Sequence, residues 1–297
     1  MDANKTIGVV HGGTSHARAE SLLYGKHISK VLSELGMEVL DLHLHPNGSW
    51  TVNGQTGDIQ TSLKKVHAVW NCLVGVDGER GIMEKLCEDC KAKVIGHDVF
   101  HSRLVSDKKN LQYALAQHGI KTPYGKVIYT ANYNKEKLKE VFASVGIPAV
   151  VKPVSGSGAW GVVVINNFGE MEYAVENLIA QNMDVLVEKL IPGIAVSCFV
   201  MEHKNLLHTN IKIHDDNANI SREDLIKIRN EALYIHNVMA FEHHVEYDFI
   251  LSPQKDGTKL FFLEANTHPS LVHGYIKKSF ASGVVGLKEY IQQKINF

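Results

Sequence analysis

The segment VKPVSGSGAWGVVV, residues 151–164, decides how the rest of the chain is interpreted. Its β-branched ends predict two short strands, and Lys152 lies at the root of a loop whose flexible or polar positions include Gly156, Ser157, Gly158 and Gly161. Because glycine has no Cβ atom, the backbone N–H groups of such a loop can approach the oxygens of a polyphosphate. The segment differs from a Walker A loop, in which the lysine follows the glycines and opens a helix. We predict a hairpin that covers phosphate groups, with a solvated glycine-rich surface hairpin as the alternative.

Length and charge narrow the class of protein. The chain has 297 residues, with 31 basic residues against 32 acidic ones and a net charge of -1. This length suits two or three packed lobes, and the balanced charge without a basic stripe argues against nucleic acid as a partner. No apolar run approaches the roughly 20 residues that span a bilayer, and the first residues are typical of a strand rather than of a signal peptide. We therefore expect a cytoplasmic protein with no membrane partner.

Hydrophobic periodicity predicts an α/β chain with three lobes. Strand and helix patterns alternate over residues 1–103, which predicts a βαβ lobe with a mainly parallel sheet. Residues 104–183, which include the glycine-rich loop, predict a small α+β lobe. Residues 184–297 predict a larger lobe with a mostly antiparallel sheet, whose strands are expected near residues 185–189, 195–201, 206–213, 244–251 and 259–265.

A hairpin predicted near the C-terminus brings together three oxygen-bearing side chains, Asp248, Glu264 and Asn266. Asp256-Gly257 lies between two apolar runs and is a strong turn signal. A hairpin centred on position 256 places Asp248 opposite Glu264, and alternation along a strand puts Asn266 on the same face as Glu264. Two carboxylates and an amide oxygen suit Mg²⁺ that is shared with phosphate groups. An exposed acidic strand face is the alternative, and the apolar neighbours of these residues disfavour it.

These motifs, in this order, resemble the ATP-grasp superfamily over essentially the whole chain. The narrower resemblance is to its D-alanine-D-alanine ligase-like branch. It implies an α+β ATP-grasp fold in which the second and third lobes hold ATP between them. The segments that carry the resemblance are Gly12-Gly-Thr-Ser15 with Arg18 and Ser21, Gly78-Glu-Arg-Gly-Ile82, Ser106-Asp-Lys108, Gly119-Ile-x-Thr-Pro123, Lys152-Pro153, Glu188-Lys189 and Glu264-x-Asn-Thr-x-Pro269.

The resemblance also implies a chemistry and a set of site residues. The chemistry is ATP-driven ligation of a carboxylate to an amine through an acyl phosphate, with two magnesium ions held by Asp248, Glu264 and Asn266. Small-molecule carboxylates and amines are the implied partners, and a homodimer is a possible assembly. The residues implied to bind ATP are Lys108, Lys152, Ser155, Gly156, Ser157, Gly158, Gly161, Glu188, Lys189 and Leu190.

The chain departs from this family in the half that holds the amino-acid substrates. Glu246 stands where the family has an arginine that steadies the developing oxyanion, and Tyr275 aligns with a serine that grips the second substrate. Ala17 replaces the acid that holds the first ammonium group. We therefore expect a divergent amino-acid pocket, and leave the catalytic residues unassigned with three candidates, Arg18, Lys212 and Tyr275.

Other functions remain open at this point. The chain could be a D-alanine-D-alanine ligase whose substrate roles have moved to nearby residues. It could instead be a nucleotide-binding regulator that has lost catalysis, although the full metal trio argues against that. A phosphotransferase with a non-carboxylate acceptor is a further alternative, because the acceptor pocket is the part that the sequence leaves undefined.

Overall fold

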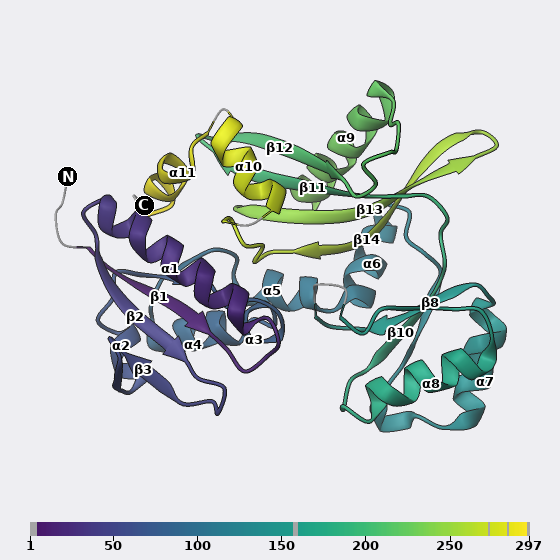
Figure 1. Cartoon of the computed structure of the whole chain (residues 1–297), viewed down its shortest axis with the longest axis horizontal. Helices are drawn as coiled ribbons and strands as arrows, with labels where there is room; N and C mark the ends of the chain where they lie inside the picture. Colours follow the sequence, from purple (N-terminus) through teal and green to yellow (C-terminus); the bar gives the residue numbers. More distant parts are fainter. Residues whose placement is uncertain (1–4, 157–159, 273, 284, 296–297) are drawn as a thin grey trace.

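Three β-sheets organise the chain (Figure 1). The computed structural model describes residues 5–156, 160–272, 274–283 and 285–295. Within these ranges, no helix combines the length and the apolar character needed to cross a membrane. One mixed sheet is followed by two antiparallel sheets, which confirms the predicted class and the order of the sheet types.

The first sheet is mainly parallel, with the strand order β4-β3-β2-β1-β5-β6. Strands β2, β1, β5 and β6 pair in parallel, and the short β3–β4 hairpin extends one edge in the antiparallel sense. The strands are β1 (Thr6–Gly12), β2 (Glu38–Leu44), β3 (Trp50–Val52), β4 (Gln55–Thr56), β5 (Ala68–Asn71) and β6 (Val94–Ile95). The accompanying helices are α1 (Arg18–Glu34), α2 (Ile59–Leu63), α3 (Val76–Glu79) and α4 (Ile82–Cys90).

The middle sheet is antiparallel, with the strand order β7-β10-β8-β9. Its strands are β7 (Gly125–Ile128), β8 (Ala149–Pro153), β9 (Val163–Ile165) and β10 (Val185–Lys189), and the helices α7 (Lys135–Val145) and α8 (Phe168–Ile179) cover one face. The structure corrects the prediction that residues 185–189 belong to the third sheet, because β10 pairs with β7 and β8. The strand pattern shows that these residues are extended, but it does not identify their hydrogen-bonding partners.

The third sheet is also antiparallel, with the order β12-β11-β13-β14. Its strands are longer than those of the middle sheet: β11 (Ile194–His203), β12 (Leu206–Ile213), β13 (His244–Gln254) and β14 (Gly257–Asn266). Helices α5 (Val99–Ser106), α6 (Lys108–Gln117) and α9 (Arg222–Val238) supply residues to the core on one face. The last helices, α10 (Gly274–Ser282) and α11 (Leu287–Ile295), lie toward the first lobe (Figure 1).

Side-chain alternation gives the third sheet one apolar face and one polar face. On β13, Val245, Tyr247 and Phe249 are buried in the core beneath α6 and α9. Glu246 and Asp248, at the alternate positions, line a cavity on the other side of the sheet. The polar face is therefore free to form a site against the middle sheet.

A β-bulge in the last hairpin sets which residues of β14 reach that polar face. Near the tip, Gln254 pairs with Gly257, a register that would place Asp248 opposite Leu263 if it continued. The register shifts between Asp248 and Phe249, so that Asp248 pairs with Glu264 and Leu263 is the extra residue. The predicted Asp248–Glu264 pairing is confirmed. Leu260, Phe262, Glu264 and Asn266 are alternate residues, so a regular strand would point all four side chains to the same face. The bulge allows Leu260 and Phe262 to be buried in the core while Glu264 and Asn266 face the cavity.

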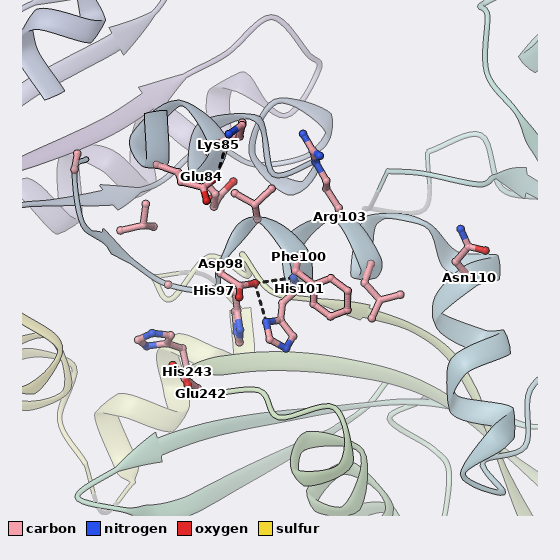
Figure 2. Close-up of a pocket in the computed structure, with 16 residues that line it drawn as sticks. Glu84, Lys85, His97, Asp98, Phe100, His101, Arg103, Asn110, Glu242 and His243 are labelled. Carbon is pink, nitrogen blue, oxygen red and sulfur yellow. Dashed lines mark hydrogen bonds and ion pairs between the residues drawn. The ribbon is translucent and has the colours of Figure 1, made fainter. Parts of the chain in front are cut away.

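A second cavity, with a volume of about 950 Å³, lies between α4, α5 and the segment before β13 (Figure 2). Histidine rings gather on its wall: the His97 ring centroid is 5.6 Å from that of His243, and the His101 ring nitrogens lie 2.8 Å from the Asp98 carboxylate and 3.0 Å from the Met239 carbonyl oxygen. Burial and the nearby Lys294 lower the pKa of His243 to about 3. Burial also lowers the pKa of His97, so His97 and His243 are neutral packing groups at the junction of the first and third lobes.

The lowered histidine pKa values make stability depend on pH. Burial lowers the pKa of His236 to about 4, so both His236 and His243 take up protons near pH 6.5 when the chain is unfolded but only near pH 3–4 when it is folded. The stabilisation that these two neutral histidines contribute to the fold is complete above pH 6.5 and is lost as the pH falls toward 4. Between pH 7 and pH 5 we expect a loss of roughly 1–2 kcal/mol per histidine in the free energy of unfolding. Urea unfolding of the wild type and of His243→Gln at both pH values measures this. An unchanged pH dependence in the variant would contradict the assignment.

Candidate active site

A cleft lies between the polar faces of the middle and third sheets. Its cavity has a volume of about 860 Å³. The middle lobe contributes Lys152 and the end of β10, and the third sheet contributes the acidic residues of β13 and β14. Loops of the first lobe and the start of α10 close one end. The lining residues include Ala17, Glu20, Lys152, Glu188, Lys189, Leu190, Lys212, Glu246, Asp248, Glu264, Asn266, Ser270 and Tyr275.

Lys152 is held at the cleft by a buried ion pair. On β8 and β10, Val151 and Val187 point into the lobe core, so Lys152 and Glu188 point to the cleft face. The Lys152 Nζ atom lies 2.6 Å from Glu188 Oε2, and both side chains are buried. Gln112 of α6 donates a second hydrogen bond to Glu188 Oε1 at 2.6 Å. The ammonium group is therefore fixed at the position where the sequence predicted a phosphate ligand.

Lys108 connects the glycine-rich loop to the acidic strand. It is the first residue of α6, whose N-terminus is capped by Asp107, and its Nζ atom lies 3.0 Å from Glu264 Oε2. The same ammonium donates to the carbonyl of Gly156. Lys108, Gly156, Glu264 and Asn266 also line a small cavity beside the main one. The Lys108 ammonium group thus lies between Gly156 of the loop and Glu264 and Asn266, which are predicted to bind metal.

The glycine-rich loop rests on the first lobe. Arg80 donates to the Ser155 hydroxyl at 3.0 Å, and the Trp160 ring stacks on His16 with 5.6 Å between centroids. Gly161 has a φ of +71°, and a Cβ atom there would lie 3.2 Å from Pro153. The sequence calls for glycine at this bend, and the two phosphate-loop candidates Ser157 and Gly158 lie outside the described residues.

Two half-buried carboxylates, Asp248 and Glu264, oppose each other on the floor of the cleft. Burial raises the pKa of Asp248 to about 8, and the neighbouring charges of Glu264 and Glu246 add to the effect. Ser197 donates to Asp248 Oδ1 at 2.5 Å. Asn266 completes a set of hard oxygen donors, which suits a divalent cation.

A cation bound to these side chains would take the rest of its ligands from a bound molecule. No cluster of three or more histidine, cysteine, aspartate or glutamate side chains that could hold a metal ion occurs in the described ranges. The two carboxylates and the Asn266 amide leave room for oxygens from elsewhere. Mutual repulsion between Asp248 and Glu264 shows that positive charge would stabilise this point, so the residues fit a cation that is shared with phosphate groups.

The opposite end of the cleft has a different character. Lys212, Ser197, Asp248 and Glu264 form one row across the four strands of the third sheet. Glu246 lies beside that row, and burial raises its pKa. The Lys212 Nζ atom is 5.9 Å from the centroid of the Tyr275 ring, and the neighbouring Glu246 adds to burial in raising the pKa of the Tyr275 hydroxyl. This corner offers one acid, one cation and one phenol to a ligand.

The structure brings together most of the predicted site residues but separates one. Lys212 and Tyr275 line the cleft, whereas the Arg18 side chain turns to His43, with 3.1 Å between Arg18 Nη2 and His43 Nε2. Sequence reasoning missed Gln112 and Ser197. Gln112 follows Lys108 by four residues on the same helix and could have been found from that spacing. Ser197 reaches Asp248 only through the pairing of β11 with β13, which the sequence does not specify.

The sequence is similar to a known protein family and to known enzymes. Residues 115–218 match the family model described as D-ala D-ala ligase C-terminus. The D-alanine-D-alanine ligase of Halalkalibacterium halodurans is 26% identical over 98% of this chain and 98% of its own length. The enzyme of the same name from Cupriavidus pinatubonensis is 24% identical over 97% of this chain and 90% of its own.

Solved structures share the fold over the whole chain. The VanG D-Ala:D-Ser ligase from Enterococcus faecalis superposes with a TM-score of 0.82 at 21% identity, covering 98% of both chains. D-alanyl-alanine synthetase A from Vibrio cholerae gives a TM-score of 0.85 at 17% identity, covering 99% of this chain and 98% of that one. The cleft, its lysines and its acidic hairpin thus stand on a three-sheet framework that these solved structures share, and over nearly its full length the chain is similar to D-alanine-D-alanine ligases.

Proposed function

We propose that this protein is an ATP- and Mg²⁺-dependent ligase that joins a small carboxylate to an amine. The observation that carries the proposal is the meeting, in one cleft, of two buried lysines with the Asp248–Glu264 pair and Asn266. A D-alanine-D-alanine ligase from Bacillus anthracis, determined in complex with ATP, has the same fold with a TM-score of 0.75. Its nucleotide supports ATP as the ligand of this cleft.

The residues can supply what phosphoryl transfer needs. A carboxylate oxygen of the substrate attacks the γ-phosphorus and ADP leaves; the amine nitrogen then attacks the acyl carbon and inorganic phosphate leaves. Both steps depend on positioning and on neutralising phosphate charge, which Lys108 and Lys152 provide. Asp248, Glu264 and Asn266 would hold Mg²⁺, which would supply positive charge against the phosphate groups. Gly156, whose carbonyl accepts from Lys108, lies beside this point, and a loop here would keep water from an acyl phosphate that water hydrolyses.

The pocket for the amino-acid substrates differs from that expected of the family. Glu246 places an acid two residues before Asp248, where negative charge opposes a developing oxyanion. Ala17 lines the cleft without a carboxylate, and Tyr275 presents a phenol. We therefore propose a substrate pair other than two D-alanine molecules. The D-alanine-D-alanine ligase function remains the second candidate, supported by relatives that align over nearly the full chain.

A screen for substrate-stimulated ADP release tests the proposal. The purified protein is incubated with ATP and Mg²⁺ and with pairs drawn from D- and L-amino acids, small carboxylic acids and amines. Stimulation by another pair, with product detected by mass spectrometry, supports the divergent ligase. Strong stimulation by D-alanine alone favours the second candidate. Tight ATP binding without turnover in any mixture would favour a nucleotide-binding regulator.

Removing the Lys152 charge should weaken nucleotide binding. Lys152→Gln is expected to raise the Kd of a non-hydrolysable ATP analogue by about 10-fold or more, because one charge-assisted phosphate contact is lost. The variant also leaves Glu188 without its cation, so the melting temperature should fall. Lys139→Gln, at an exposed position of α7, is the control and should change neither quantity. Unchanged affinity in Lys152→Gln, measured on folded protein, would contradict the phosphate role.

Neutralising a metal ligand should separate activity from stability. Asp248→Asn is expected to lower turnover by more than about 100-fold through weaker Mg²⁺ binding. Burial raises the pKa of Asp248 to about 8, so the free energy of unfolding of the wild type falls as the pH rises from about 4 toward 8. Asparagine does not ionise, so the metal-free variant should be more stable than the metal-free wild type at pH 7. Asp256→Asn, at the exposed hairpin tip, is the matched control. Wild-type turnover in Asp248→Asn would remove this residue from the site.

A further inference from the structure

The end of β14 is tied to the first lobe immediately after Asn266. His268 donates its backbone N–H to Asn266 Oδ1 at 2.8 Å. Its ring Nε2 atom lies 3.0 Å from Glu84 Oε1, on helix α4 of the first lobe. Both side chains are buried, with exposed fractions of 6% for His268 and 2% for Glu84. A single residue thus contacts a predicted metal ligand through its backbone and another lobe through its side chain.

Residues of the first sheet in turn fix the Glu84 side chain. Asn71, at the end of β5, donates to Glu84 Oε1 at 2.8 Å, and its own Oδ1 accepts from the backbone N–H of Leu73 at 3.0 Å. The Glu84 side chain lies at the edge of the second cavity, next to Lys85 on α4 (Figure 2). Hydrogen bonds therefore run without a break from the first sheet, through Glu84 and His268, to Asn266.

Asn266 needs such support because of its place in the sheet. It is the last residue of β14 and pairs with Glu246, so the ladder offers no further pair to fix its backbone beyond this point. An amide oxygen that binds a metal must be held within about 0.5 Å of its productive position by neighbouring hydrogen bonds. The His268 backbone provides that hydrogen bond, and the Glu84 ion pair fixes where the His268 backbone lies.

We propose that Glu84 and His268 are positioning residues for the metal site, through which docking of the first lobe sets the affinity for the divalent cation. The proposal rests on the function proposed above. It assigns to the Glu84–His268 pair a role beyond joining the two lobes, because the pair acts on Asn266. A purely structural pair would affect the stability of the fold and leave the cation affinity of the folded protein unchanged.

The experiment measures cation binding rather than turnover. Mn²⁺ is titrated into the protein in the presence of a saturating non-hydrolysable ATP analogue, and free Mn²⁺ is followed by electron paramagnetic resonance. Glu84→Gln keeps the size of the side chain and removes its charge, and we expect it to raise the Kd of Mn²⁺ by about 10-fold. Affinity for the analogue measured without a divalent cation should remain that of the wild type.

Glu88→Gln is the matched control, since Glu88 lies one turn further along α4, is exposed and pairs with Lys85 at 3.2 Å. It should bind Mn²⁺ as the wild type does. A cycle of Glu84→Leu, His268→Leu and their combination should be non-additive, with the double variant no weaker in Mn²⁺ binding than the weaker single variant. Should the leucine variants fail to fold, Glu84→Gln alone decides the matter.

Two negative results have different meanings. If Glu84→Gln melts at a lower temperature but binds Mn²⁺ with wild-type affinity, the pair only joins the lobes and the positioning role is wrong, while the ligase proposal stands. If the wild type itself binds no Mn²⁺ with the analogue present, the metal site of the proposed function is wrong, and this inference falls with it.

Discussion

The structure around the cleft depends on the electrostatic repulsion between two half-buried carboxylates. Asp248 and Glu264 face each other across neighbouring strands on the floor of the cleft, and desolvation together with the charge of Glu264 raises the pKa of Asp248. Such a pair is costly unless positive charge is placed between or beside its members. Lys108 provides part of that charge through Glu264, and Ser197 donates a hydrogen bond to Asp248. Negative charge at Asp248 is therefore costly here, and a cation bound at this point would lower that cost.

The same requirement for charge compensation connects the lobes. Lys152 compensates Glu188 within the middle sheet, Lys108 links α6 to β14, and His268 links β14 to α4 through Glu84. Each of these acids is largely buried or lies at the cleft, so each pair constrains the geometry more than a surface salt bridge would. The stabilisation that a buried ion pair provides is largely lost when one partner moves away. The lobes are therefore expected to hold one relative arrangement whenever the cleft is occupied.

The two halves of the cleft differ in how closely their residues match those expected from the family resemblance. The half predicted to hold phosphate contains two lysines, Gly156 and the oxygen donors, which are the groups that the proposed ATP and metal chemistry requires. The other half contains Glu246, Tyr275 and Lys212, and Glu246 is an acid where the resemblance leads us to expect an arginine. Because specificity depends on differences in binding free energy among a few contacts, a change confined to this half can alter the substrate without altering the phosphoryl chemistry.

Much of this could be predicted from local sequence. The glycine at position 161 follows from a backbone φ that other residues adopt with strain, the cap of α6 follows from Asp107, and the apolar runs around Asp248 and Glu264 indicate a central hairpin. The sequence therefore determined the sheet types, the glycine at the bend at position 161 and the hairpin that carries the metal-binding candidates, because each depends on residues that are close along the chain.

Only the tertiary structure decided the rest. The bulge at Leu263, the placement of β10 in the middle sheet, the turn of Arg18 toward His43 and the contact of Glu84 with His268 all depend on which strands pair and how the lobes pack. Periodicity shows which way a side chain points relative to its own strand, but it does not identify the partner across a lobe boundary, since that partner is chosen by packing and charge compensation among residues far apart in the chain.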